Sequence, residues 1–218
     1  MITSDPFGFR KDVELFRSKM AQYPFSENDL NLLVSIFKQA CLYNTVVSFN
    51  DGLYHRNFLK SIVYDVMNAI IAITDRRERY VQLNIRSSVE HIARIALNKE
   101  YQGGEFDETV RRKDFSFLKE KKNKEVWSYL HNVYIRACYF VHSSPKAKLK
   151  IFSSYSELER GDTKFNYSNT VKNLHKLVNH ITIIFLTYYL GDIEDSFFRT
   201  KSEIKFLLSQ NMYHKHFS

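Results

Sequence analysis

The sequence predicts an all-α fold, a single-domain helical bundle of five to seven long helices. Apolar residues recur every three or four positions along most of the 218-residue chain, which is the period of a helix that buries one face. Only six Gly and three Pro occur, too few for the tight turns of a β-sandwich or of an α/β fold with many short loops. The chain is 44% hydrophobic and 15% aromatic, which is enough for a sizeable core.

Two helices are expected near the N-terminus. The first covers residues 5–23, with Asp5 as its N-cap and Pro6 at its first helical position. The second covers residues 27–49, and the four residues from Ser26 resemble a capping box in front of it. Both helices carry an apolar face that must be buried against the rest of the chain.

The remaining apolar patterns predict the core of the bundle and a C-terminal segment. The expected helices cover residues 55–74, 75–99, 125–142, 168–190 and 192–212. In this division, the N-terminal helices of residues 1–54 pack on a core of residues 55–190. Gly191 separates that core from one final amphipathic helix.

We expect the chain to be organised around the helix of residues 125–142. Its apolar stripe has helical spacing and consists of Val126, Leu130, Val133, Tyr134, Ala137, Cys138 and Val141. At about 100° per residue, Arg136, Tyr139 and His142 fall on the opposite half. The large apolar side chains on that outer half are Tyr129, Ile135 and Phe140. We expect a second copy of the chain to cover this half.

This helix should end at Ser143-Ser144-Pro145, because a proline disfavours the α conformation in the residue before it and cannot donate an intrahelical hydrogen bond. His142 then lies in the last turn, where unpaired carbonyls favour a cationic imidazole. An Arg at 136, five intervening residues and this His resemble the signature motif of the HEPN superfamily. The resemblance covers the motif and a helical context of about residues 61–190.

The resemblance implies a function. Many HEPN proteins are metal-independent RNases that form dimers, often as toxins or phage-defence effectors. Carried over, the motif makes Arg136 and His142 the catalytic pair, and we expect Tyr139 and Ser143 to support them. It also implies RNA as the substrate, a homodimer, a possible antitoxin or regulatory protein partner, and neither a metal nor a cofactor.

The expected chemistry is attack of the ribose 2′-hydroxyl on the adjacent phosphate, with His142 as acid or base and Arg136 stabilising the phosphate. Ideal helix geometry separates the two residues by about 9 Å along the axis and about 120° around it, so a symmetric pair of helices would be needed to form one cleft. The alternative is a surface cation and a capping histidine. The chain would then be a non-catalytic helical module that binds nucleic acid or a partner protein.

The helix of residues 75–99 carries Arg86, Glu90 and Arg94 at successive four-residue steps, so Glu90 can pair with either arginine. One interpretation is an exposed ion-pair ladder that contributes little stability. The other is that Glu90 orients an arginine toward phosphate, or supports Arg136 and His142 from a neighbouring helix.

A net charge of +8 and a pI near 9.3 favour an acidic partner such as nucleic acid. Basic runs with interleaved aromatic residues flank the 125–142 helix. Our candidate RNA-binding residues are Arg111, Arg112, Lys113, Lys121, Lys122, Lys124, Lys146 and Lys148. Such runs are also typical of a solvated surface.

Cys41 and Cys138 sit among apolar residues of expected helices, which suits free thiols in a reducing cytoplasm. The N-terminus lacks the pattern of a signal peptide and no apolar run reaches 18 residues, so we expect no membrane span. His175 and His180 share no face with a carboxylate at ligand spacing, and we expect no metal site.

Overall fold

The computed structural model describes residues 5–101, 108–149 and 152–217 and confirms the all-α prediction. Within these ranges there is no strand, and the elements are α1 (Phe9–Met20), α2 (Glu27–Phe49), α3 (Arg56–Thr74), α4 (Glu78–Glu100), α5 (Arg112–Lys121), α6 (Lys124–Val141), the 3-10 helix η1 (Pro145–Ala147), α7 (Tyr155–Glu159), α8 (Tyr167–Ser196), α9 (Lys201–Leu207) and α10 (Gln210–Phe217). The described residues form ten α-helices, more than the five to seven long helices expected, because α5, α7, α9 and α10 are short additional helices.

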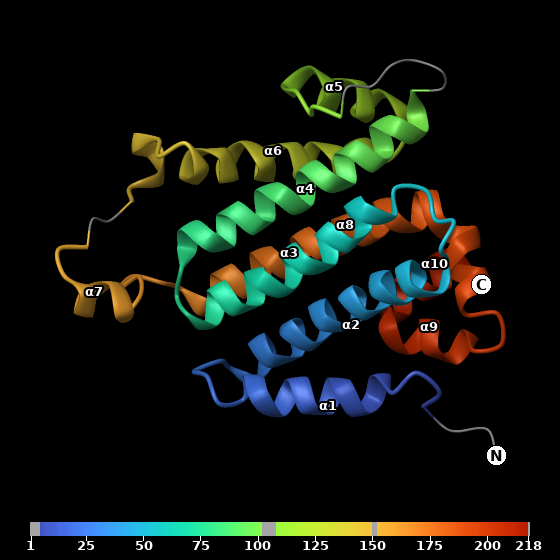
Figure 1. The fold of residues 1–218 in the computed structure, drawn as a ribbon, viewed down its shortest axis with the longest axis horizontal. Coiled ribbons are helices and arrows are strands. Elements are labelled where there is room, and N and C mark those ends of the chain that lie inside the picture. Colours follow the sequence, from blue (N-terminus) through green and yellow to red (C-terminus); the bar gives the residue numbers. More distant parts are fainter. Residues whose placement is uncertain (1–4, 102–107, 150–151, 218) are drawn as a thin grey trace.

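The long helices pack as neighbours in chain order, and α8 joins them. Figure 1 shows α1, α2, α3, α4 and α6 side by side in this sequence, with α8 contacting α2, α3, α4 and α6. One cluster of buried apolar residues extends from Phe9 to Leu208. Hence the N-terminal helices and the C-terminal segment share a core with the middle of the chain.

Polar side chains also connect α2 to α8 inside this core. The Tyr43 and Thr182 hydroxyls are 2.5 Å apart, and Gln39 Nε2 donates to Asn179 Oδ1 at 2.8 Å. Buried polar groups cost free energy unless they are paired. The pairing therefore fixes the register in which α2 lies against α8.

Two local signals at the N-terminus had different outcomes. The capping box at Ser26 is confirmed, since its hydroxyl accepts from Asp29 N and the Asp29 carboxylate accepts from Ser26 N. The predicted start at Asp5 is wrong, because α1 begins at Phe9 after Gly8, whose φ is 74°. Asp5 still caps the helix from a distance, as its Oδ2 accepts from the backbone N–H of Arg10 at 3.0 Å.

The predicted helix of residues 192–212 is wrong. Helix α8 continues through Gly191 to Ser196, with one non-helical residue at Tyr189, and two short helices follow. A glycine inside a helix costs only about 1 kcal/mol. Ile193 and Phe197 are buried beyond it, so tertiary packing outweighs the local stop signal.

The apolar stripe of α6 is rotated relative to the prediction. Its buried residues are Trp127, Leu130, Tyr134 and Ala137. Val126, Val133, Cys138 and Val141 are only partly buried at the edges. Trp127 was missing from the predicted stripe, and it faces the ring of Phe115 in α5 at 6.5 Å.

By length and hydropathy alone, α2 is the one helix among the described residues that could cross a membrane. In the fold, half of its most apolar window is buried, and the helix packs against α1, α3, α8 and α9.

Candidate functional site

The end of α6 brings together the first group of candidate residues. The chain leaves the helix through a Schellman motif, in which Ser144 N donates to Tyr139 O at 2.8 Å and Ser143 N donates to Phe140 O. Ser143 occupies the left-handed position with φ 51°, where glycine is more usual. Its hydroxyl lies 3.4 Å from Arg79 Nη2 at the start of α4. Pro145 then begins η1, so the predicted helix end is confirmed.

Arg136 and His142 both reach solvent at this end of α6, but they do not share one site within the chain. Arg136 lines a cavity beside the helix, whereas His142 is the exposed C-cap and is not among the residues that line it. Tyr139 lies between them, with Lys146 Nζ 5.0 Å from its ring centre. Within one chain, only Arg136 of this pair therefore borders the cavity.

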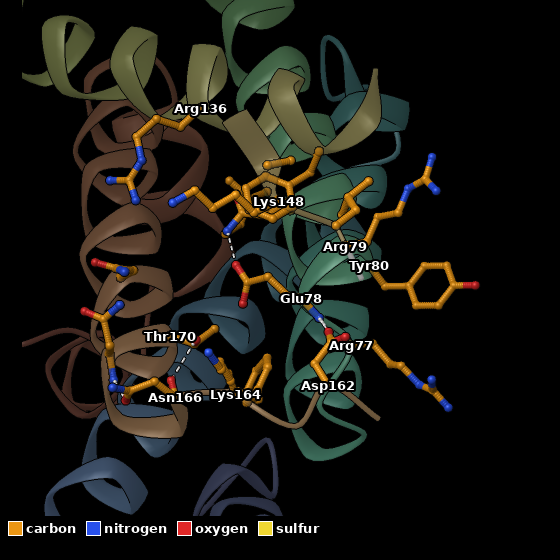
Figure 2. Close-up of a pocket in the computed structure, with 18 of the residues that line it drawn as sticks. Arg77, Glu78, Arg79, Tyr80, Arg136, Lys148, Asp162, Lys164, Asn166 and Thr170 are labelled. Atoms are coloured by element: carbon orange, nitrogen blue, oxygen red, sulfur yellow. Dashed lines mark hydrogen bonds between the residues drawn. The ribbon is translucent and has the colours of Figure 1, made fainter. Parts of the chain in front are cut away.

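The cavity has a volume of about 580 Å³ and is enclosed by four segments of chain. These are the first turns of α4, the last turns of α6, the segment on either side of α7 and the first turns of α8. Figure 2 shows Arg136, Lys148 and Glu78 pointing into the cavity, while Arg77, Arg79 and Tyr80 point away from it. Its inner wall therefore combines two cations with one carboxylate.

Glu78 is a partly buried carboxyl in the lining of the cavity. Burial raises the pKa of this carboxyl and the nearby charge of Asp162 raises it further, whereas a hydrogen bond from Gln82 and the charge of Arg136 lower it. Gln82 Nε2 donates to Glu78 Oε1 at 2.7 Å and so fixes the carboxylate. A partly buried acid facing a cavity is a typical feature of a functional site.

The wall formed by residues 152–165 is attached to the α3–α4 turn. The Asp162 carboxylate accepts from Glu78 N at 2.8 Å, and Asp162 N donates to Arg76 O at 2.9 Å. Gly161 has φ 72°, and a Cβ at this position would lie 2.7 Å from Asp75 O. Only glycine allows this close approach, so the wall depends on it.

The fourth wall is the amide-rich start of α8. Asn166, Asn169 and Asn173 recur at helical spacing and line the cavity together with Thr170. The Asn166 side chain caps the helix by accepting from Asn169 N at 3.0 Å. The partly positive end of a long helix therefore faces the same space as Arg136.

The ladder of Arg86, Glu90 and Arg94 forms as predicted, but it is partly buried. Glu90 pairs with Arg86 at 3.1 Å and with Arg94 at 2.7 Å, and the three side chains are 15–27% exposed. Arg86 also lies 3.4 Å from the Tyr134 hydroxyl, and Arg94 donates to Glu108 O. The three side chains are therefore partly buried, whereas the first interpretation took the ladder to be exposed. In the described part of the chain, these polar contacts lead to the α4-facing side of α6 and not to Arg136 or His142.

The two predicted basic runs lie on different halves of α6. Helix α5 lies along the N-terminal half (Figure 1). There the Phe115 ring stacks on His131 at 4.7 Å and Lys121 lies over the Phe117 ring. The exposed cations of this half are Arg111, Arg112, Lys113, Lys121, Lys122 and Lys124. Lys146 and Lys148 lie at the opposite end with the cavity.

Much of the apolar outer half of α6 is covered by the chain itself. The Tyr129 ring stacks on His180 at 4.1 Å and lies under Lys176 Nζ. Phe140 lines the cavity. Ile135 is partly exposed and remains the apolar residue on which contact with a second copy would depend.

Sequence reasoning missed most of the cavity. Glu78, Gln82, Asp162 and Lys164 gave no recognisable motif, although the asparagines at 166, 169 and 173 were visible at helical spacing. In the described ranges, no group of three or more His, Cys, Asp or Glu side chains could hold a metal ion. Both cysteines are free thiols.

Comparisons with protein-family models, with curated proteins and with solved structures found no match to this chain. The functional argument therefore rests on the residues and their geometry.

Proposed function

We propose that the protein is a metal-independent endoribonuclease of HEPN type that cuts RNA at a site formed by two copies of the chain. The observation that carries the proposal is the end of α6. There Arg136 projects into a cation-lined cavity, and His142 stands exposed six residues further on. A basic chain of net charge +8 would attract the RNA phosphates.

In this mechanism the ribose 2′-oxygen attacks the adjacent phosphorus, the bond to the 5′-oxygen breaks, and a 2′,3′-cyclic phosphate and a 5′-hydroxyl form. His142 exchanges protons with these oxygens. The Arg136 guanidinium donates two parallel hydrogen bonds to the phosphate as its negative charge grows. Tyr139 and Ser143 support the pair, Ser143 by fixing the turn that presents His142.

A second copy is needed because one helix directs the two side chains about 120° apart. A symmetric contact through Ile135 would bring His142 of one copy toward Arg136 of the other. The HEPN resemblance suggests a biological setting for such an enzyme. It would act as a toxin or phage-defence effector in a reducing cytoplasm, together with a regulatory protein partner.

The test is cleavage of a labelled RNA by the wild type and by His142→Ala and Arg136→Ala, each with and without EDTA. The matched control is Arg199→Ala, an exposed arginine in the turn after α8. Loss of the acid or base should lower the rate by about 10²- to 10⁴-fold, and loss of the phosphate contact by about 10²- to 10³-fold. Full activity of both variants, or cleavage that requires a divalent ion, would refute the mechanism.

The second candidate is a non-catalytic helical module that binds nucleic acid or a partner protein. One observation favours it: the chain's own residues cover Tyr129 and Phe140, which reduces the apolar surface left for a second copy. RNA binding without cleavage by the dimeric wild type would select this candidate.

A further inference from the structure

We propose that the cavity binds one nucleoside phosphate, with the base inside and the phosphate at Arg136 and Lys148. Its ligand is either a free nucleotide or one nucleotide of an RNA strand, because both present the same chemistry. The site belongs to a single chain and requires neither a second copy nor His142. It can therefore exist whether or not the protein cuts RNA.

The size and apolar lining of the cavity fit a nucleobase. Ligand sites commonly enclose about 300 to 1,000 Å³, and this one measures about 580 Å³. Three phenylalanine rings line it, Phe140 from α6 and Phe152 and Phe165 from the wall of residues 152–165. Bases stack favourably on aromatic side chains whatever their sequence.

The polar groups of the cavity favour a base that carries N–H donors. The Glu78 carboxylate is held by Gln82 and faces the cavity, and an ionised carboxylate only accepts hydrogen bonds. Guanine offers two adjacent N–H donors on one edge, which match the two oxygens of a carboxylate. Asn169 and Asn173 can both donate and accept, so they can meet the other polar atoms of the base. Guanine is therefore the expected base.

The cations of the cavity are placed for a phosphate. Figure 2 shows the Arg136 guanidinium and the Lys148 ammonium directed toward the same space from α6 and from the residue after η1. Lys164 adds a third positive charge to the lining. Arginine binds phosphate through paired hydrogen bonds and lysine through its charge. The first turn of α8 adds a partial positive charge nearby.

The placement of Glu78 is costly without a ligand. It lies partly buried and close enough to Asp162 for the two negative charges to repel each other. The Glu78 side chain is not the N-cap of α4, because the Asp162 carboxylate already accepts from the Glu78 backbone N–H. A base with N–H donors would compensate this cost.

The experiment is isothermal titration calorimetry of the full chain with GMP, AMP, CMP, UMP and guanosine. A 2′-O-methyl pentanucleotide, UUGUU, serves as a strand that cannot be cut. The variants are Glu78→Gln and Asn169→Leu. Their matched controls are the exposed Glu194→Gln on α8 and Asn44→Leu on α2. Thermal unfolding of each variant reports whether the fold is intact.

GMP should bind more tightly than the other nucleotides, and guanosine should bind more weakly because it lacks the phosphate. Since a hydrogen bond to a charged group contributes about 1.5 to 3 kcal/mol, Glu78→Gln should weaken GMP binding about 10- to 100-fold and remove the preference for guanine. Asn169→Leu should also weaken it, while both controls bind as the wild type does. If the pentanucleotide binds and the free nucleotides do not, and if Glu78→Gln weakens this binding to the same extent, the ligand is one nucleotide of a strand.

The proposal is overturned if neither the nucleotides nor the pentanucleotide bind at millimolar concentration. It is also overturned if binding is the same in folded Glu78→Gln and Asn169→Leu as in the wild type. Loss of RNA cleavage in His142→Ala with GMP binding retained would support both proposals. If cleavage needs Arg136 and His142 but nucleotide binding does not depend on Glu78, the ribonuclease proposal is supported and the nucleotide site is refuted.

Discussion

Replacing Asp65 with Asn should stabilise the protein at neutral pH. Asp65 lies on α3 and is 8% exposed, and burial raises its carboxyl pKa from 3.8 to about 6 against a lowering hydrogen bond from Ser87. Within the described part of the chain, Asp65 Oδ2 is buried without a hydrogen-bond partner. Its nearest cation candidate, His91 Nε2, is 3.9 Å away, which is too far for a hydrogen bond.

The distance between Asp65 and His91 suggests an ion pair, but the directions in which their pKa values are shifted do not. A true ion pair would lower the pKa of the carboxyl and raise that of the imidazole, whereas burial and the charge of Arg94 lower the pKa of His91 to about 4. We favour a neutral imidazole because Arg94 Nη1 lies 3.4 Å from His91 Nδ1 and repels a second positive charge. At pH 7 the folded protein thus contains a poorly compensated buried carboxylate.

The sign and size of the stability change in Asp65→Asn follow from the linkage between protonation and folding. A carboxyl whose pKa is raised in the folded state lowers the stability of the protein as the pH rises from about 4 to about 6. The loss persists at every pH above about 6. A shift from 3.8 to about 6 corresponds to at most about 3 kcal/mol. Asn does not titrate, so Asp65→Asn should gain about 1 to 3 kcal/mol at pH 7.5 and little at pH 4.

Urea unfolding of Asp65→Asn and wild type at pH 4.5, 6 and 7.5 measures this difference, with the exposed Asp195→Asn on α8 as the control. As the pH falls, His91 lowers the free energy of unfolding while Asp65 raises it. The reason is that the lowered pKa of His91 makes its protonation unfavourable in the folded state. This contribution is common to both proteins. A variant that is less stable at pH 7.5, or a difference that does not change with pH, would refute the reasoning.

Three further substitutions test other parts of the fold. Ser143→Gly should raise stability by about 1 kcal/mol in thermal unfolding because it relieves a left-handed backbone, and an unchanged or lower melting temperature would count against the Schellman assignment. Gly161→Ala should lose more than about 1 kcal/mol and weaken GMP binding, since its Cβ would meet Asp75 O; wild-type stability would contradict that packing. Ile135→Asp should convert a dimer to a monomer in sedimentation experiments, and a dimer that persists would place the interface elsewhere.

Most of the helical architecture was predictable because it depends on local signals. The capping box at Ser26 needs only residues within one turn, and it set the start of α2 correctly. The end of α6 before Pro145 is likewise a property of the peptide bond preceding proline. Periodicity found the long helices because each must bury one face.

The errors occurred where distant contacts outweigh local preferences. Gly191 is a reasonable helix stop, yet burial of Ile193 and Phe197 extends α8 beyond it. The stripe of α6 was shifted because Trp127 was not recognised as facing α5, a helix that had been interpreted only as a charged run. The position of a face around a helix depends on its neighbours, which periodicity does not identify.

The cavity was not predictable for the same reason. Its four walls come from parts of the chain between residues 77 and 173, and apart from Arg136 no lining residue belongs to a recognised motif. What joins them is the contact of Gly161 and Asp162 with the α3–α4 turn, which brings the start of α8 opposite the end of α6. From the sequence, only Arg136 and Lys148 had been assigned a functional role.

Arg136 belongs to both proposed sites, and this has a consequence for how they work together. A phosphate held by Arg136 in the cavity lies on one side of α6, while His142 of the same chain points about 120° away. Nucleotide binding then needs one chain, whereas cleavage needs the His142 of a second copy at that phosphate. On dilution below the dimer dissociation constant, the cleavage rate per chain should fall while GMP binding per chain stays constant. Cleavage that remains proportional to protein concentration after full dissociation would mean that a single chain brings both residues to the phosphate, which ideal helix geometry does not allow without a rearrangement of α6.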